Sequence, residues 1–327
     1  MTVLIRKTNW HGLDALALEN EYLCTVTVPE LGAKVVSLFD KRNQKEWLVG
    51  PGSRPVKKVT YGAWFHEQDL SGWDEMFPTI IACPYPGPGE QQGAPLPDHG
   101  EVWSLPWDIE RAEEGKLTLR VQGRTLPYQL IRTLVYTTVS ALLEFQYQLT
   151  NLGHVRMPYI WAAHPQFVCG LGDEIILPSH VTEVCNTIPA PWGWGEPETR
   201  FHWPLAIGVD GQPVRIDRIG PSSLHKARKF FLMPDMRAEW TGIRTPVGDW
   251  ICLDWNPALV PYLGLWVDEG AISHESVVAL EPTTGFYDSL AVACEKNEVN
   301  VLEPGIVQTW TLRVRLGTNH EPFPHDE

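Results

Sequence analysis

Strict alternation of apolar and polar side chains is the feature that most limits how this chain can fold. Apolar residues occupy every second position in residues 144–150 and 309–316, and shorter examples cover residues 24–28 and 116–121. A period of two belongs to β-strands that bury one face, which is typical of antiparallel sheets. Helical periodicity is scarce elsewhere. The sequence therefore predicts an all-β protein built as a large antiparallel β-sandwich.

No feature divides the 327 residues into separate domains. The 28 prolines and 27 glycines are spread between the expected strands rather than gathered in one linker, and we find no internal repeat. Sandwiches of this length often form one domain, so we expect a single domain over residues 1–327. Residues 13–22 and 222–231 have room for a helical turn or two, and we expect the proline-containing tail 318–327 to fray.

The charge balance argues against several classes of partner. The formal net charge of −14 repels nucleic acid and anionic membrane surfaces, whereas a small neutral ligand fits it well. No run approaches the length of a membrane span, and the first residues lack the long apolar core of a signal peptide. The six cysteines include no CxxC pair. We therefore expect free thiols and a cytoplasmic protein.

Two apolar runs end in an ionisable residue followed by proline. Residues 157–165 end in His164 and Pro165, and the run that begins at residue 277 ends in Glu281 before a second proline. Proline removes a backbone donor from the sheet and holds the preceding residue extended. The pattern predicts that two central strands stop at these positions and that a cleft opens there.

Three residues are candidates for proton transfer, and each has a structural alternative. A buried Glu281 would have a raised pKa and suit a general base, but it would equally suit a structural carboxylate paired with arginine or backbone amides. A histidine on an apolar strand, such as His164, is often a core residue bonded to a carbonyl. His99 lies in a turn-rich loop, where the neighbouring Asp98 either orients the imidazole or faces water.

The 15 tryptophans suit sugar binding, because the C–H faces of a sugar ring stack on flat aromatic surfaces, although most tryptophans in a sandwich belong to its core.

The sequence contains few motifs that would indicate other kinds of chemistry. There is no phosphate-binding glycine loop, no G-x-S-x-G and no H-E-x-x-H. The acidic neighbours Asp69, Asp74 and Glu75 lack EF-hand spacing, and the histidines lack metal-ligand spacing, so we expect no metal.

Taken in order, these segments resemble the aldose 1-epimerases of the galactose mutarotase-like superfamily over nearly the whole chain. Each motif alone is weak, whereas the ordered set is specific. The matching segments are residues 29–40, 72–79, 98–103, 164–167, 263–266, 279–285 and 302–305.

The resemblance implies a galactose mutarotase-like supersandwich and an aldose 1-epimerase that interconverts the α and β anomers of an aldose without a cofactor. His99 and His164 match the histidines that contact the sugar hemiacetal, and Glu281 matches the catalytic carboxylate. In the family's mechanism the glutamate takes the anomeric proton and a histidine, here His164, protonates the ring oxygen. The partner implied is a small-molecule sugar, with the protein a monomer or a homodimer.

Six further residues are candidates for substrate binding, although two departures affect them: Gln166 stands where an aromatic residue is common, and residues 71–77 lack the arginine–asparagine motif of the galactose-specific branch. A non-catalytic carbohydrate-binding or sugar-sensing protein is the alternative function. Glycoside hydrolysis usually requires two carboxylates and ranks last. The binding candidates are Trp73, Asp74, Asp98, Gln166, Asp254 and Trp266.

Overall fold

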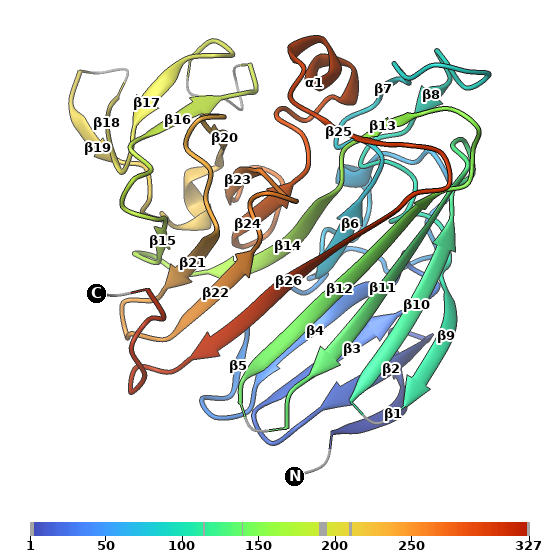
Figure 1. Cartoon of the computed structure of the whole chain (residues 1–327). Coiled ribbons are helices and arrows are strands. Elements are labelled where there is room, and N and C mark those ends of the chain that lie inside the picture. The colour runs from blue at the N-terminus through green and yellow to red at the C-terminus, as the bar shows by residue number, and fades with distance from the viewer. Residues whose placement is uncertain (1–2, 114, 139, 190–194, 209–210, 326–327) are drawn as a thin grey trace.

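Two large antiparallel sheets packed face to face make up most of the protein, as the all-β prediction required (Figure 1). The computed structural model describes residues 3–113, 115–138, 140–189, 195–208 and 211–325. Apart from two 3₁₀ turns, these residues contain a single short helix.

The first sheet has twelve strands in the described part of the chain, and its centre carries the cavity described below. In spatial order it contains β1 (Leu4–Trp10), β2 (Leu13–Glu19), β3 (Leu23–Val28), β4 (Lys34–Asp40), β6 (Trp73–Met76), β14 (Ala162–Cys169), β24 (Ser276–Thr283), β23 (Tyr262–Glu269), β20 (Lys226–Leu232), β16 (Glu183–Asn186) and β17 (Arg200–His202), with β5 (Lys45–Glu46) paired to β4.

The second sheet has eight strands in the described residues and covers one face of the first. Its spatial order is β15 (Glu174–Ile176), β21 (Trp240–Arg244), β22 (Trp250–Trp255), β26 (Val307–Gly317), β12 (Leu142–Asn151), β11 (Tyr128–Tyr136), β10 (Lys116–Gln122) and β9 (Asp108–Glu113).

Small elements lie in the segments between the strands of the two sheets. Three two-stranded pieces are β13 (Met157–Tyr159) with β25 (Asn300–Leu302), β18 (Leu205–Ile207) with β19 (Pro213–Arg215), and β7 (Cys83–Pro84) with β8 (Pro95–Leu96); the helical elements are η1 (Phe65–Glu67), η2 (Ser222–Leu224) and α1 (Leu290–Lys296).

The alternating segments are strands, as predicted. Burial alternates along β10, β11 and β12, whose inward side chains pack in the core between the sheets. In contrast, every residue of β24 is buried, because this central strand is covered on both faces.

Helical content differs from the sequence-based expectation. Residues 13–19 form β2, and residues 222–231 contain only the turn η2 before β20 begins. The helix α1 was not predicted. It begins after Ser289, whose hydroxyl caps the helix by accepting a hydrogen bond from the Val292 amide. The helix has only seven residues, which is too short for a helical period to be recognised in the sequence.

The C-terminal segment, for which fraying was expected, packs against the second sheet as far as it is described. Phe323 is 3% exposed and lies in a cluster with Trp240 and Trp250. The indole nitrogen of Trp250 donates a hydrogen bond to the Glu321 carbonyl at 3.0 Å. Buried aromatic surface thus holds the tail, and only residues 326–327 lie outside the described range.

Among the described residues, none of the helices has the length and apolar character that a membrane crossing requires.

Candidate active site

The two proline-terminated runs meet at one point in the first sheet, although not in the way the sequence predicted. The prediction that both strands stop there was wrong, because β14 continues to Cys169 and β24 to Thr283. Their pairing joins Ala162 to Thr283 and resumes at Gln166 with Ala279. The proline in each strand lacks an amide donor, so the ladder is interrupted between these two pairs.

His164 and Glu281 face each other across this interruption. The register is the same on both sides of it, so residue 164 lies opposite residue 281. The row continues outward to Asp74 on β6 on one side and to Gly264 on β23 on the other. A Cβ on Gly264 would lie 3.1 Å from Glu281 Oε2, so glycine leaves room for the carboxylate.

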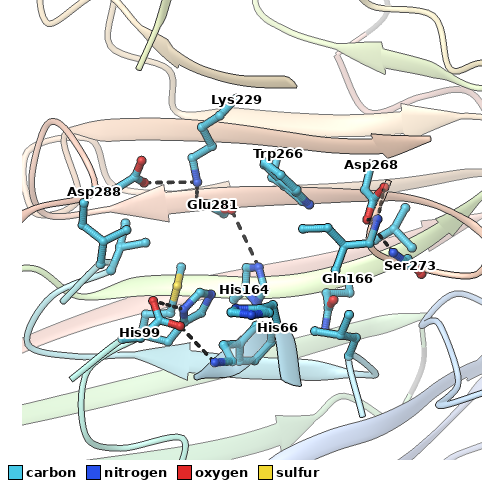
Figure 2. A pocket seen from close by; sticks show the side chains of 18 of the residues that line it. His66, His99, His164, Gln166, Lys229, Trp266, Asp268, Ser273, Glu281 and Asp288 are labelled. Carbon is cyan, nitrogen blue, oxygen red and sulfur yellow. Dashed lines mark hydrogen bonds and ion pairs between the residues drawn. The ribbon is translucent and has the colours of Figure 1, made fainter. Parts of the chain in front are cut away.

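A second row lies two residues further along the strands and therefore on the same face of the sheet. It contains Gln166, Ala279, Trp266 and Lys229 on β14, β24, β23 and β20. Five side chains of these two rows line a cavity of about 300 Å³, a size at the lower end of small-molecule sites: His164, Glu281, Gln166, Trp266 and Lys229. Figure 2 shows the polar side chains that converge on it.

The carboxylate of Glu281 is held by a buried lysine. Lys229 Nζ donates a hydrogen bond to Glu281 Oε2 and lies 3.3 Å from Asp288 Oδ1, and the side chains of Lys229 and Glu281 are 6% and 1% exposed. Burial raises the pKa of Glu281 and the Lys229 ammonium opposes that rise, leaving the pKa above its ordinary value. Burial would lower the pKa of Lys229, but Asp288 and Glu281 outweigh it and raise the pKa.

The second oxygen of Glu281 faces a histidine without a hydrogen bond. Glu281 Oε1 lies 3.9 Å from His164 Nε2, a gap too long for a direct hydrogen bond (Figure 2). Burial, followed by the charges of His99 and Lys229, holds the pKa of His164 well below its ordinary value. At this separation both groups can reach neighbouring oxygens of one small molecule bound in the cavity.

The other histidine is fixed by an aromatic ring and a carboxylate. The His99 ring stacks on Phe65 at 4.0 Å and lies 5.2 Å from the His164 ring. Asp98 Oδ1 is 3.2 Å from His99 Nδ1, while Asp98 Oδ2 accepts a hydrogen bond from the Phe65 amide. Through these contacts Phe65 of η1 holds the loop that carries His99 in position over the sheet.

The cavity brings together six of the nine residues that the sequence singled out. His99, His164 and Glu281 line it, as do the binding candidates Asp98, Gln166 and Trp266.

Asp74 lies beside the cavity but does not line it. It is fully buried opposite His164, with Lys34 Nζ 3.5 Å from its Oδ2. Burial raises the pKa of Asp74 to about 7, against the opposing charge of Lys34. Asp74 therefore supports the floor beneath the histidines rather than offering an oxygen to a ligand.

Trp73 and Asp254 lie elsewhere, which corrects their prediction as ligand contacts. Trp73 neighbours Asp74 on β6, so it points to the opposite face, where it stacks on Phe145 of the second sheet at 4.5 Å. Asp254 belongs to β22 of the second sheet and pairs with Arg315, with Nε and Oδ2 3.0 Å apart. Neither side chain lines the cavity.

Two further residues that line the cavity, Lys229 and Asp288, were not predicted from the sequence. Lys229 does leave a signal, because it sits with Arg228 inside the otherwise apolar run 227–233, and a charged residue in such a run needs a partner. Asp288 leaves none, since it follows β24 in an irregular segment that only the tertiary structure brings back to the cavity.

No group of three or more histidine, cysteine, aspartate or glutamate side chains within the described ranges is arranged to hold a metal ion.

Comparison with known proteins gives the class of this fold. The family model for aldose 1-epimerase matches residues 83–219, a segment that contains His99 and His164 and ends before Glu281. No curated protein matches the chain in sequence.

Solved structures match almost the whole chain. The Slr1438 protein of Synechocystis sp. PCC 6803 is 17% identical, with 93% of this chain and 96% of that chain covered and a TM-score of 0.69. A galactose mutarotase-like protein of Lactobacillus casei is 20% identical (93% and 100% covered, TM-score 0.64). A galactose mutarotase-like protein of Clostridium acetobutylicum is 13% identical (97% and 99% covered, TM-score 0.66).

These similarities confirm that the protein has the galactose mutarotase-like fold. The resemblance to the aldose 1-epimerase family, predicted from the ordered motifs, is confirmed by the match of the family model. At these identities the solved structures establish the fold and not the activity.

Proposed function

We propose that the protein is an aldose 1-epimerase that interconverts the α and β anomers of an aldose. The observation that carries the proposal is the placement of Glu281 and His164 on neighbouring strands, 3.9 Å apart, in a cavity that His99 also lines. Ring opening of a hemiacetal needs a base at the anomeric hydroxyl and an acid at the ring oxygen. Each positioned group contributes about 10²–10⁴-fold to such a reaction.

In the proposed reaction Glu281 Oε1 accepts the proton of the anomeric hydroxyl while His164 donates a proton to the ring oxygen. The bond between the anomeric carbon and the ring oxygen breaks, and an open-chain aldehyde forms. Rotation about the adjacent carbon–carbon bond exposes the other face of the carbonyl. Closure then reverses both proton transfers, so that Glu281 donates, His164 accepts and the other anomer forms.

This cycle requires the pair of Glu281 and His164 to hold one proton in total. A raised pKa at Glu281 and a lowered pKa at His164 bring the two groups closer in proton affinity, which suits a pair that exchanges roles in each half of the cycle. We expect kcat/KM to fall both at low pH, when the pair gains a second proton, and at high pH, when it holds none.

The walls of the cavity suit a neutral sugar. Trp266 and Phe65 offer flat apolar surfaces, while Asp98 and Gln166 offer hydrogen-bonding groups for hydroxyls. We propose that the protein acts as a monomer or a homodimer. We further propose that the protein is a single domain that works in a reducing cytosol. The six unpaired cysteines fit the second part of this proposal.

The test is the rate at which freshly dissolved α-glucose and α-galactose reach anomeric equilibrium, followed by polarimetry or NMR. Wild type should accelerate the exchange, and Glu281→Gln should lose the acceleration while keeping its circular dichroism spectrum. Saturable sugar binding without acceleration by folded wild type would instead support the alternative, a sugar-binding or sugar-sensing protein.

A further inference from the structure

Lys229 is the lone lysine or arginine among the described residues that line the cavity. The residues outside the described ranges add no candidate, because none of them is lysine or arginine. Carboxylates, in contrast, are several: Asp98, Asp268, Glu281 and Asp288 line the same space. The single cation is therefore shared among nearby anions rather than left free to bind an anionic ligand.

Two carboxylates hold the ammonium of Lys229 in place. It extends from β20 on the same face as Trp266, and its ammonium reaches Glu281 Oε2 on one side and Asp288 Oδ1, at 3.3 Å, on the other (Figure 2). The side chains of Lys229 and Asp288 are 6% and 9% exposed. A buried ammonium with two carboxylate partners is held in place, because losing either partner would leave a charge without compensation.

This contact makes the two oxygens of Glu281 unequal. Oε2 is occupied by the ammonium, whereas Oε1 faces His164 across 3.9 Å. The ammonium also stabilises the charged form of the carboxylate more than it disfavours a charged His164, because it touches the first and not the second.

We infer that Lys229, anchored by Asp288, is a positioning residue that keeps Glu281 ionised and presents Oε1 as the base of the proposed reaction. The inference rests on the proposed function for its catalytic meaning. The contact with the ammonium favours the ionised form of Glu281, so Glu281 begins as the proton acceptor. Asp288 has the opposite electrostatic effect on Glu281, because it is a second anion beside the same ammonium.

The groups that face Glu281 come from four directions. Lys229 approaches from β20, His164 from β14, Asp288 from the segment before α1, and His99 from the loop after β8. Of these, Lys229 lowers the pKa of Glu281 and Asp288 raises it. Removing each charge in turn should therefore move the titration of Glu281 in opposite directions, which a merely structural role would not do.

The experiment measures the protonation of Glu281 directly. Infrared difference spectra of wild type, Lys229→Met and Asp288→Asn are titrated with pH, and the carboxylic acid band of Glu281 is identified by its loss in Glu281→Gln. We expect the midpoint to rise by about one pH unit or more in Lys229→Met, a tenfold change in the ratio of protonated to ionised Glu281, and to fall in Asp288→Asn. The acid limb of kcat/KM should move in the same directions.

Two further variants complete the design. Lys229→Arg keeps the positive charge and should restore a midpoint near that of wild type. Lys226→Met removes an exposed lysine from the same strand, outside the cavity, and should leave both the midpoint and the activity unchanged. If Lys229→Met does not fold, the downward movement predicted for Asp288→Asn decides the matter with the same measurement.

A midpoint that stays in place in the folded variants, or that moves in the same direction in Lys229→Met and Asp288→Asn, would overturn the inference. The proposed function fails separately: wild type would then show the predicted infrared titrations without accelerating anomer exchange. Opposite movements of the midpoint together with an active wild type support both.

Discussion

Two buried glutamates on the first sheet make an instructive comparison. Glu75 on β6 faces the second sheet and Glu281 on β24 faces the cavity, and both are almost completely inaccessible to solvent. Glu75 Oε1 accepts hydrogen bonds from Arg132 Nη1 and Tyr147 Oη, each at 2.9 Å, and its Oε2 accepts one from Trp161 Nε1 at 2.8 Å. Every donor is supplied by the packed core.

Glu281 differs in one respect that matters for chemistry. Lys229 donates a hydrogen bond to one of its oxygens, while the other lies 3.9 Å from His164 Nε2, too far for a hydrogen bond. Burial raises the pKa of both glutamates, and both lie beside a cation. Burial and a charged partner therefore do not by themselves distinguish a catalytic carboxylate from a structural one, and the distinguishing feature is an oxygen that protein donors leave unoccupied.

The largest expected effect is the loss of the proposed base, Glu281. Glu281→Gln should lower kcat/KM for anomer exchange by about 10²–10⁴-fold, because the base is lost while the shape is kept. Polarimetry measures the loss, and a thermal melt verifies the fold. A folded Glu281→Gln protein with wild-type activity would remove Glu281 from the mechanism.

On the structural side, Arg132→Met should lower the free energy of unfolding by about 3–5 kcal/mol, because removing one partner leaves the Glu75 charge buried without a cation. Urea denaturation measures this loss. The protein that remains folded should still catalyse anomer exchange, since Arg132 extends from β11 of the second sheet into the core and does not line the cavity. A catalytic defect without a loss of stability would contradict the assignment of Glu75 as structural.

Asp74 sharpens the comparison, because it neighbours Glu75 in sequence yet points to the cavity face. Its pKa is about 7 in the folded protein, raised by burial, and about 3.9 in an unfolded chain. Between these two pH values Asp74 is protonated in the folded protein and ionised in the unfolded chain. The free energy of unfolding therefore falls as the pH rises through this range.

Asp74→Asn removes that titration. Relative to wild type, its melting temperature should therefore increase between about pH 4 and pH 7, by roughly 2–4 °C for each kcal/mol involved. Melting curves of the two proteins across this range test the prediction. A constant difference between the two melting temperatures would show that Asp74 does not titrate there.

The smallest effect is expected at Asp254, which pairs with Arg315 on the second sheet with side chains 20% and 33% exposed. Asp254→Asn should cost about 0–1 kcal/mol of stability, as is usual for partly exposed ion pairs, and leave kcat/KM unchanged. A rise in KM for the sugar would place Asp254 in substrate binding after all.

The strand pattern and two residues of the site could be predicted from the sequence for definite physical reasons. Alternation reports which face of a strand is buried, so β10, β12 and β26 could be predicted without knowing their neighbours. His164 and Glu281 stood out because an ionisable residue inside an apolar run conflicts with burial. This conflict identified the two residues but did not predict the strand geometry around them, since both strands continue past their prolines.

Other residues were decided by long-range pairing. Trp73 and Asp74 belong to one motif, but the register of β6 against β14 sends the tryptophan into the core and the aspartate toward the histidines. Asp288 is 59 residues from Lys229 in sequence, yet the two meet because β20, β23 and β24 are adjacent in space. Likewise, the C-terminal tail is polar in composition and is held by one buried aromatic ring, Phe323.

The sequence by itself therefore determined what each segment is: strands with one buried face, and a small set of titratable residues placed where burial is costly. These properties depend on a residue and its near neighbours in the chain. The tertiary structure alone decided which strands became neighbours, which face of β6 met the cavity, and that Lys229 rather than arginine or a backbone amide accompanies Glu281. Such contacts depend on strand order and register, which are fixed by the packing of the whole molecule.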